Sequence, residues 1–152
     1  MNTSFQLLVE SLETKYQQLI AMEPIIAEKV PLDTPIGGVY LFSDNSAALY
    51  AGRTKRKIGM RIRNHFSSAK DCPFAWLLTR EITQQFATYR KEGSRRDLIS
   101  RPEFSSVYEE SKARIRKMNV RYVQEQGPLK QALLEIYVAV ASQARYNDFG
   151  TS

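Results

Sequence analysis

The sequence predicts an α/β fold in which a few short strands are flanked by helices. Three segments have the β-rich or alternating pattern of strands: 38–42, 48–52 and 120–124. Longer segments between and around them repeat apolar residues every three or four positions, as amphipathic helices do. The 152 residues suffice for one domain, 1–152, with a hydrophobic core.

Residues 4–22 are predicted to form the first helix, with Thr3 or Ser4 as its N-cap. The apolar positions at helical spacing are Phe5, Leu8, Leu12 and Leu19. Prolines interrupt the connection that follows the helix. Residues 1–35 are therefore expected to be a helical extension, which would pack on its own domain or take part in a dimer.

Residues 38–42 and 48–52 are predicted to pair as a β-hairpin, because the turn-forming residues 43–46 separate them. With a five-residue loop, Tyr40 would lie directly opposite Tyr50, and opposite residues point to the same face of a sheet. A change of register by one residue would place the two tyrosines on different faces.

Three helices are expected between the hairpin and the third strand, at about 57–68, 73–92 and 103–118. The first has Ile58, Ile62 and Phe66 as its buried ridge, while Arg61 and His65 share another face. The second begins at Pro73 and ends at Gly93. Its expected apolar stripe is Phe74, Leu77, Leu78, Ile82, Phe86 and Tyr89.

The last helix starts at Gly127-Pro128 and contains an almost entirely apolar stretch, 132–141, in which Glu135 is the one charged residue. A helix that is apolar nearly all round is normally buried. A buried carboxylate without a partner costs several kcal/mol or changes its protonation. Either a salt bridge to an arginine or lysine or a bound metal would compensate Glu135, and the composition favours neither.

Composition restricts the partners and the metal chemistry. The formal charge of +6 suits a polyanionic partner, and no apolar run is long enough to span a membrane. Glu10 and Glu13 argue against a secretory signal peptide, so a cytoplasmic location is expected. A single cysteine, Cys72, and a single histidine, His65, exclude an internal disulfide and cysteine-rich or multi-histidine metal sites. A metal would therefore be Mg²⁺, Mn²⁺ or Ca²⁺, held by carboxylate and water oxygens.

Basic residues gather in two segments that are candidates for DNA binding. The candidates are Arg53, Lys55, Arg56 and Arg63 in the first segment, and Lys112, Arg114, Arg116 and Lys117 in the second. The alternative for each segment is a solvated helix face. Taken alone, His65 is also expected on a helix surface, and each tyrosine is expected to be a packing residue.

In combination, these residues resemble the GIY-YIG nucleases. Gly38-Val39-Tyr40 and Tyr50-Ala51-Gly52 are similar to the two family motifs, with Val39 and Ala51 as mild departures. The other matching positions follow in the family's order: Arg61, His65, Glu135 and Asn147. The resemblance covers about residues 36–68 and 119–149. Residues 70–118 would be a helical insertion, which would either contact DNA through its basic end or thicken the core.

The resemblance implies a three-stranded, mainly antiparallel sheet and a metal-dependent DNA endonuclease. Glu135 would bind Mg²⁺ or Mn²⁺, and Arg61 would hold the phosphate. A tyrosine, Tyr40 slightly favoured over Tyr50, would be the general base, once Arg61, Arg53 and the metal had lowered its pKa from about 10. His65 would relay a proton or contact phosphate, and Asn147 would fix the geometry of the site.

Two alternatives stay open on the sequence. A non-catalytic nucleic-acid-binding module would keep the same scaffold, although it has no use for a lone buried glutamate. Among nucleases, the small size favours a restriction-like enzyme over a repair or mobile-element nuclease. Cutting both strands with one active site requires two subunits or two encounters, which leaves a homodimer open.

Overall fold

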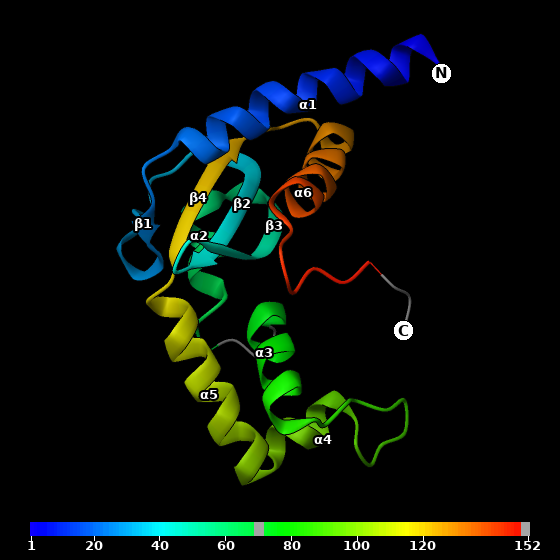
Figure 1. The fold of residues 1–152 in the computed structure, drawn as a ribbon. Coiled ribbons are helices and arrows are strands. Elements are labelled where there is room, and N and C mark those ends of the chain that lie inside the picture. The colour runs from blue at the N-terminus through cyan, green and yellow to red at the C-terminus, as the bar shows by residue number, and fades with distance from the viewer. Residues whose placement is uncertain (69–71, 150–152) are drawn as a thin grey trace.

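The computed structural model describes residues 1–68 and 72–149, which form a four-stranded antiparallel sheet surrounded by helices (Figure 1). The strands are β1 (Ile25–Ile26), β2 (Ile36–Asp44), β3 (Ala47–Lys57) and β4 (Asn119–Gln124). Their order is β1-β4-β2-β3, which makes β3 an edge strand. The helices are α1 (Thr3–Ala21), α2 (Ile58–Asn64), α3 (Pro73–Thr83), α4 (Arg95–Ser100), α5 (Pro102–Arg116) and α6 (Pro128–Ser142), with a 3₁₀ turn, η1 (Ala27–Lys29).

The expected α/β class is confirmed, but the sheet has a fourth strand that the sequence analysis missed. Ile25 pairs with Val120 and Ile26 with Asn119, so β1 covers the otherwise free edge of β4. A two-residue strand is too short to show alternation, and it lies in the proline-interrupted connection that was expected to be a loop.

The hairpin has a different register from the expected one. Asn45 and Ser46 form a two-residue turn with positive φ at both positions. Next to the turn, a bulge shifts the register between the pairs Ser43–Ala48 and Phe42–Tyr50. Tyr40 therefore faces Gly52, and Tyr50 faces Phe42. The expected Tyr40–Tyr50 pairing is wrong by two residues, and a shift of two preserves the face of every side chain. Both tyrosines consequently still point to the same side of the sheet.

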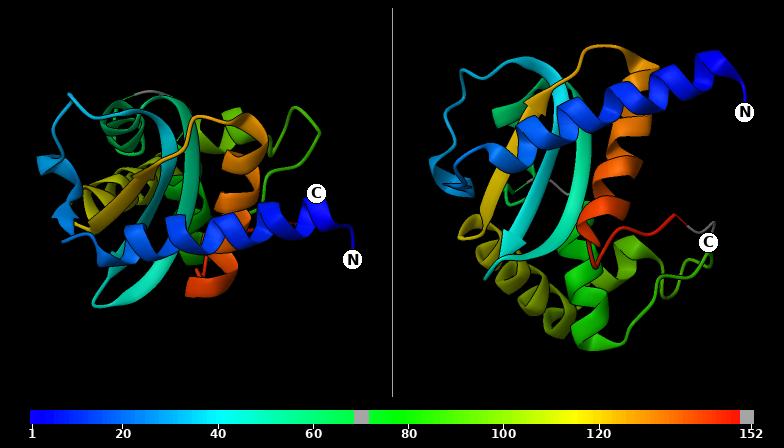
Figure 2. Two further views of the ribbon diagram at one scale, coloured as in Figure 1. Left: turned by 90° about the horizontal axis from the view of Figure 1, so that it is seen from above. Right: turned by 45° about the horizontal axis from the view of Figure 1, so that its top comes forward.

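The two faces of the sheet pack against different helices. Val39 and Leu41 of β2 belong to a core with α1 and α6, whereas Tyr40 and Phe42 belong to a larger core with α2, α3 and α5. Figure 2 shows α1 lying across the strands. Leu12 and Leu19 of α1 are buried in the first core, so the N-terminal helix packs on its own domain.

The predicted helices are present with altered ends. The N-cap of α1 is Asn2, whose side chain accepts a hydrogen bond from the backbone of Phe5, rather than Thr3 or Ser4. The ridge of Ile58, Ile62 and Phe66 is buried as expected, although α2 already ends at Asn64.

The helix expected over 73–92 is wrong beyond Thr83. Gln84 adopts the left-handed conformation and ends α3, after which the chain turns back. Phe86 and Tyr89 of the expected apolar stripe consequently lie outside the helix and are exposed, and Ile82 in its last turn is exposed as well. A further short helix, α4, follows and is capped by the Ser94 side chain.

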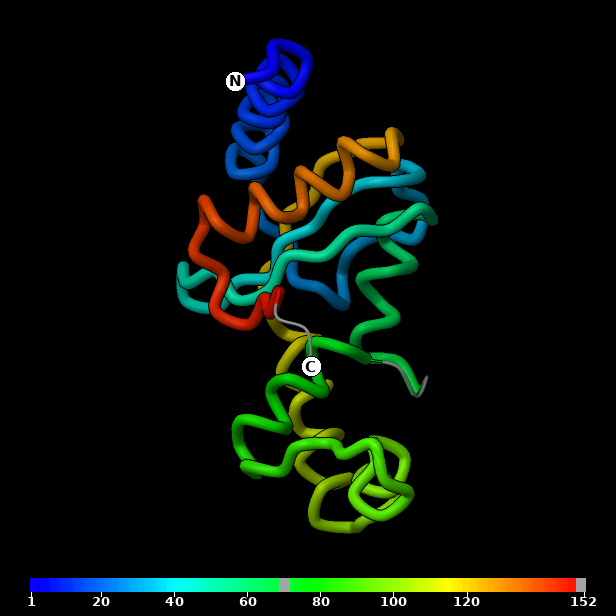
Figure 3. The backbone as a smooth tube through the Cα atoms, turned by 90° about the vertical axis from the view of Figure 1, so that its right-hand side faces the viewer, coloured from blue at the N-terminus to red at the C-terminus, as the bar shows by residue number. Residues whose placement is uncertain are grey.

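The insertion forms its own group of helices. Residues 70 and 71 lie outside the described residues, and the rest of 70–118 comprises α3, α4 and α5, which gather at one end of the sheet (Figure 3). Phe74, Phe104 and Ile115 belong to the same buried core as Tyr40, so the insertion does enlarge the core. Among the described residues, no helix has both the length and the apolar character needed to cross a bilayer.

Candidate active site

Two predicted glycines allow close approaches around the hairpin. A Cβ on Gly52 would lie 2.4 Å from the hydroxyl oxygen of Tyr40, so the absence of a side chain lets the Tyr40 ring lie over the edge strand. A Cβ on Gly38 would lie 2.3 Å from the carbonyl oxygen of Val123, which explains the tight pairing with β4. Gly52 therefore positions a candidate catalytic side chain, and Gly38 positions its strand.

His65 lies directly behind Tyr40 and is fully buried, so the expectation of a surface residue is wrong. Because α2 ends at Asn64, His65 caps the helix and its ring turns inward. The ring lies edge-on to Tyr40, Phe42 and Tyr50, with centroids 5.3–5.5 Å away. Its Nε2 is 2.7 Å from the hydroxyl oxygen of Tyr40.

The protonation of His65 follows from its surroundings. Burial, assisted by the charge of Arg61, lowers the pKa of His65 to about 3, so the ring is neutral near pH 7. Its Nδ1 is buried and has no hydrogen-bond partner in the described part of the chain. A buried N–H without an acceptor is rarer than a buried acceptor without a donor. We therefore assign the proton to Nε2, which donates it to the oxygen of Tyr40.

Tyr40 has the opposite pKa shift to the one expected. Burial raises the pKa of Tyr40 above 10.0, and the neighbouring Tyr50 and Glu135 add to the increase. Arg61 opposes it through its charge and through a hydrogen bond to Tyr40, as expected, but burial is the larger effect. Arg53 does not contribute to this shift. The protein groups alone hold Tyr40 in its neutral, protonated form at pH 7.

Tyr50 reaches a surface cleft of about 310 Å³ at the edge of the sheet. Its ring stacks on Phe74 of α3, with centroids 4.8 Å apart and the planes within 8° of parallel. Glu135 and Asn147 line the same cleft. The opposite wall comes from the insertion, where Arg95 lies over the ring of Trp76 at 4.6 Å. The cleft thus combines three predicted site residues with residues that the sequence analysis did not assign to the site.

Glu135 is less buried than expected, because α6 lies on the surface and exposes Ile136 and Val140. The Glu135 side chain is 24% exposed, and Arg53 Nε lies 4.0 Å from its carboxylate. Burial raises the pKa of Glu135, and the charge of Arg53 opposes the increase. The salt bridge that the sequence analysis left open is thus present, with a long separation of 4.0 Å between the two atoms. It satisfies the carboxylate incompletely, since no hydrogen bond to it is found within the described residues.

Asn147 anchors the segment that follows α6 to the edge strand. Its side-chain oxygen accepts a hydrogen bond from the backbone N–H of Ala51 at 2.7 Å. Its side-chain nitrogen donates to the carbonyl oxygen of Ala51 at 2.8 Å. Asn147 therefore makes on β3 the pair of hydrogen bonds that a further strand would make, and it fixes one wall of the cleft relative to Tyr50.

The donor set of the cleft is compatible with a hard divalent cation. Glu135 and Asp148 both line it and offer carboxylate oxygens, the ligands that Mg²⁺ and Mn²⁺ prefer. Among the described residues, no cluster of three or more histidine, cysteine, aspartate or glutamate side chains is found. The protein would therefore supply few ligands, with Glu135 the foremost, and water would complete the coordination shell.

Some of the predicted DNA-binding side chains are exposed to solvent, whereas others are engaged in contacts within the protein. Arg53, Lys55 and Arg56 are exposed on β3. By contrast, Arg63 donates to the carbonyl oxygen of Val30 at 2.6 Å and has its Nε buried. Arg63 therefore fastens α2 to the preceding connection, and its availability for DNA is low.

The basic end of α5 is engaged in contacts with the protein. Lys112, with a side chain 7% exposed, pairs with Glu109 at 2.8 Å and donates to the carbonyl oxygen of Ser67. The remaining pairings of this segment are Arg114 with Asp44, Arg116 over the Phe66 ring, and Lys117 with Glu28. None of these four basic residues lines the cleft. The insertion therefore lines the cleft with Trp76 and Arg95, and not with the basic end of α5.

Trp76, Arg95 and Asp148 are cleft residues that the sequence analysis did not select. Two features of the sequence could have pointed to them: Arg95 belongs to a short basic run, and Asp148 directly follows Asn147. Comparison of the chain with family models, with curated proteins and with solved structures found no match.

Proposed function

We propose that this protein is a metal-dependent DNA endonuclease of the GIY-YIG type, which hydrolyses phosphodiester bonds in the cleft at the edge of the sheet. One observation supports this most. Tyr50, Glu135 and Asn147, which are far apart in the sequence, line a single cleft. The Tyr50 ring packs against His65, which is hydrogen-bonded to Tyr40. These are among the residues on which the family resemblance rests.

Phosphodiester hydrolysis needs an activated water, neutralised phosphoryl oxygens and a stabilised leaving oxygen. Glu135 would hold a divalent cation, which supplies positive charge to the phosphate and to the leaving oxygen when bound. Arg61 is the second positive group, and its guanidinium is suited to a forked pair of hydrogen bonds to phosphate. Its interaction with Tyr40 brings the phosphate contact next to the proposed base.

Tyr40 is the proposed general base, because the two groups able to stabilise a tyrosinate surround its oxygen. His65 donates its Nε2 proton to that oxygen, and the positive charge of Arg61 favours the anion. Neutral His65 thereby positions Tyr40 and stabilises its anion without itself titrating near pH 7. Tyr50, which is stacked on Phe74 and faces the cleft, would orient the attacking water or the substrate.

The proposal is tested by incubating supercoiled plasmid with the protein in Mg²⁺, in Mn²⁺ or in EDTA. We expect nicking or linearisation that depends on the metal and is abolished in Glu135→Ala, while much of the DNA binding is retained. Glu92→Ala removes an exposed carboxylate outside the cleft and should cleave like the unchanged protein. Discrete fragments would indicate a sequence-specific, restriction-like enzyme.

Two outcomes would contradict the proposal. Full activity in Glu135→Ala would show that the metal-binding residue is wrongly assigned. Absence of cleavage with every metal, together with a gel shift of the DNA, would favour the non-catalytic nucleic-acid-binding module.

A further inference from the structure

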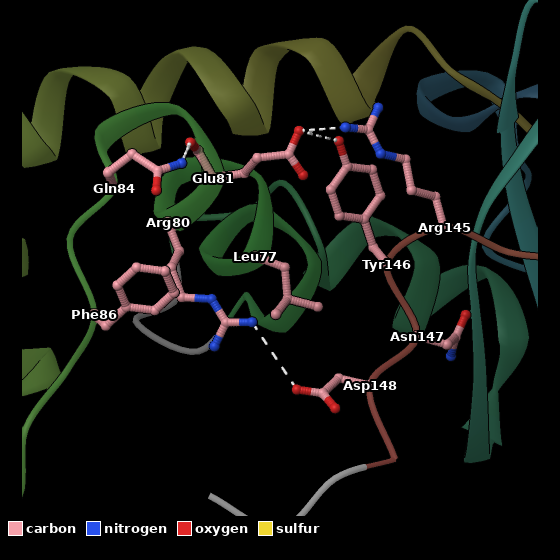
Figure 4. Close-up of a pocket in the computed structure, with 9 residues that line it drawn as sticks. All are labelled: Leu77, Arg80, Glu81, Gln84, Phe86, Arg145, Tyr146, Asn147 and Asp148. Atoms are coloured by element: carbon pink, nitrogen blue, oxygen red, sulfur yellow. Dashed lines mark hydrogen bonds and ion pairs between the residues drawn. The ribbon is translucent and has the colours of Figure 1, made fainter.

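A second hollow, of about 380 Å³, adjoins the candidate cleft along α3 (Figure 4). Leu77, Asn147 and Asp148 line both hollows, so the two lie side by side between α3 and the segment after α6. The two hydrogen bonds between Asn147 and Ala51 hold this segment on the edge strand. The position of the second hollow relative to Tyr50 and Glu135 is therefore fixed.

Arginines and aromatic rings line the second hollow in pairs. The Arg80 guanidinium lies 5.3 Å from the centroid of the exposed Phe86 ring, and that of Arg145 lies 5.1 Å from the Tyr146 ring. Phe86 reaches Arg80 because Gln84 ends α3 in the left-handed conformation and turns the chain back. Cations beside aromatic faces suit a nucleic-acid strand, which alternates phosphates with stacking bases.

Exposed carboxylates occupy both arginines in the free protein. Asp148 lies 4.0 Å from Arg80, while Glu81 lies 2.6 Å from Arg145 and accepts a hydrogen bond from Tyr146 (Figure 4). Ion pairs between exposed side chains are weak, because water screens them. A DNA phosphate group, like these carboxylates, carries one negative charge and two acceptor oxygens, and can therefore replace them on the guanidinium groups.

We propose that this second hollow binds the backbone of one DNA strand beside the bond to be cut, with Arg80 and Arg145 contacting its phosphates. Asp148 and Glu81 hold these positions until DNA enters. The inference rests on the proposed function for the location of the cut, and the three lining residues that the two hollows share favour DNA as the occupant over an unrelated acidic ligand.

The test measures binding of a fluorescent DNA duplex by anisotropy in EDTA, where no cleavage occurs, over a series of salt concentrations. Arg80→Ala and Arg145→Ala should each raise Kd roughly five- to tenfold and lower the salt slope by about one. Arg80→Lys keeps the charge and should retain most of the affinity. Arg90→Ala, on the exposed loop outside this hollow, is the matched control and should change neither quantity.

Asp148→Asn distinguishes the proposed replacement of a carboxylate by a DNA phosphate from simple damage to the fold. It removes the carboxylate that competes for Arg80, so DNA should bind more tightly than to the unchanged protein. An unchanged Kd in both alanine variants, or an equal loss in Arg90→Ala, would overturn the assignment. Weaker binding by Asp148→Asn would overturn the exchange of carboxylate for phosphate.

The two proposals fail separately. Loss of binding in the Arg80 and Arg145 variants, with no cleavage by the unchanged protein, would retain the strand site and reject the nuclease. Normal binding in both variants, together with cleavage that requires Glu135, would reject the strand site and retain the nuclease.

Discussion

The hairpin with α2 and the helical insertion hold their polar groups in different surroundings. In the first region, Tyr40 and His65 are buried, packed among aromatic rings and joined at 2.7 Å. In the second, Arg95 is exposed and rests on the face of Trp76. Groups held rigidly are suited to chemistry, which depends on precise geometry, whereas an exposed arginine is suited to binding. Variants of the two regions should therefore affect different kinetic constants.

The largest effect is expected for Tyr40→Phe. If Tyr40 is the general base, kcat should fall by roughly 10²- to 10⁴-fold, with KM nearly unchanged. Tyr50→Phe keeps the ring stacked on Phe74 and should cost about tenfold or less. Steady-state cleavage of a short duplex measures both variants. A larger loss in Tyr50→Phe would assign the base to Tyr50.

The pH dependence provides a second measurement of the same assignment. Burial raises the pKa of Tyr40 above 10.0, so the deprotonated fraction should increase tenfold per pH unit below that pKa. The logarithm of kcat/KM should therefore rise with a slope of about one between roughly pH 6 and pH 9. His65, whose pKa is about 3, is neutral throughout this range and should add no further inflection. A pH-independent rate would contradict a tyrosine base.

An intermediate effect is expected at Asn147, which joins the end of α6 to the hairpin region. Asn147→Ala removes both hydrogen bonds to Ala51 and should lower the free energy of unfolding by about 1–3 kcal/mol, measured by urea denaturation. Asn147→Asp keeps the acceptor for the Ala51 N–H but sets a carboxylate oxygen against the Ala51 carbonyl oxygen, so it should not restore the lost stability. Equal stability of Asn147→Ala and the unchanged protein would show that this anchor is dispensable.

The smallest effect is expected in the insertion. Arg95→Ala should raise KM by roughly three- to tenfold and leave kcat nearly unchanged, because an exposed arginine contributes to binding before and during the reaction alike. Arg96→Ala, its exposed neighbour that does not line the cleft, is the control. A fall in kcat for Arg95→Ala would abolish the contrast between the two regions and place Arg95 in the chemistry.

Local patterns predicted much of the fold and part of the site. The helical ridge of α2, the Gly-Pro start of α6 and the two strands of the hairpin depend on neighbouring residues, and each is present. Tyr50, Glu135 and Asn147 were selected from the sequence and line one cleft. The hairpin register was wrong because a two-residue turn and a bulge together set the pairing, and the strand pattern does not show a bulge.

By itself, the sequence determined most of the helices and the three longer strands, because periodicity and turn residues act over a few positions. The tertiary structure decided what surrounds each polar side chain. Burial made His65 neutral and raised the pKa of Tyr40, while partners elsewhere in the chain occupied Lys112. The tertiary structure also brought the insertion to the cleft, where Arg95 is one of the lining residues. These outcomes depend on contacts between residues far apart in the sequence, which no local pattern specifies.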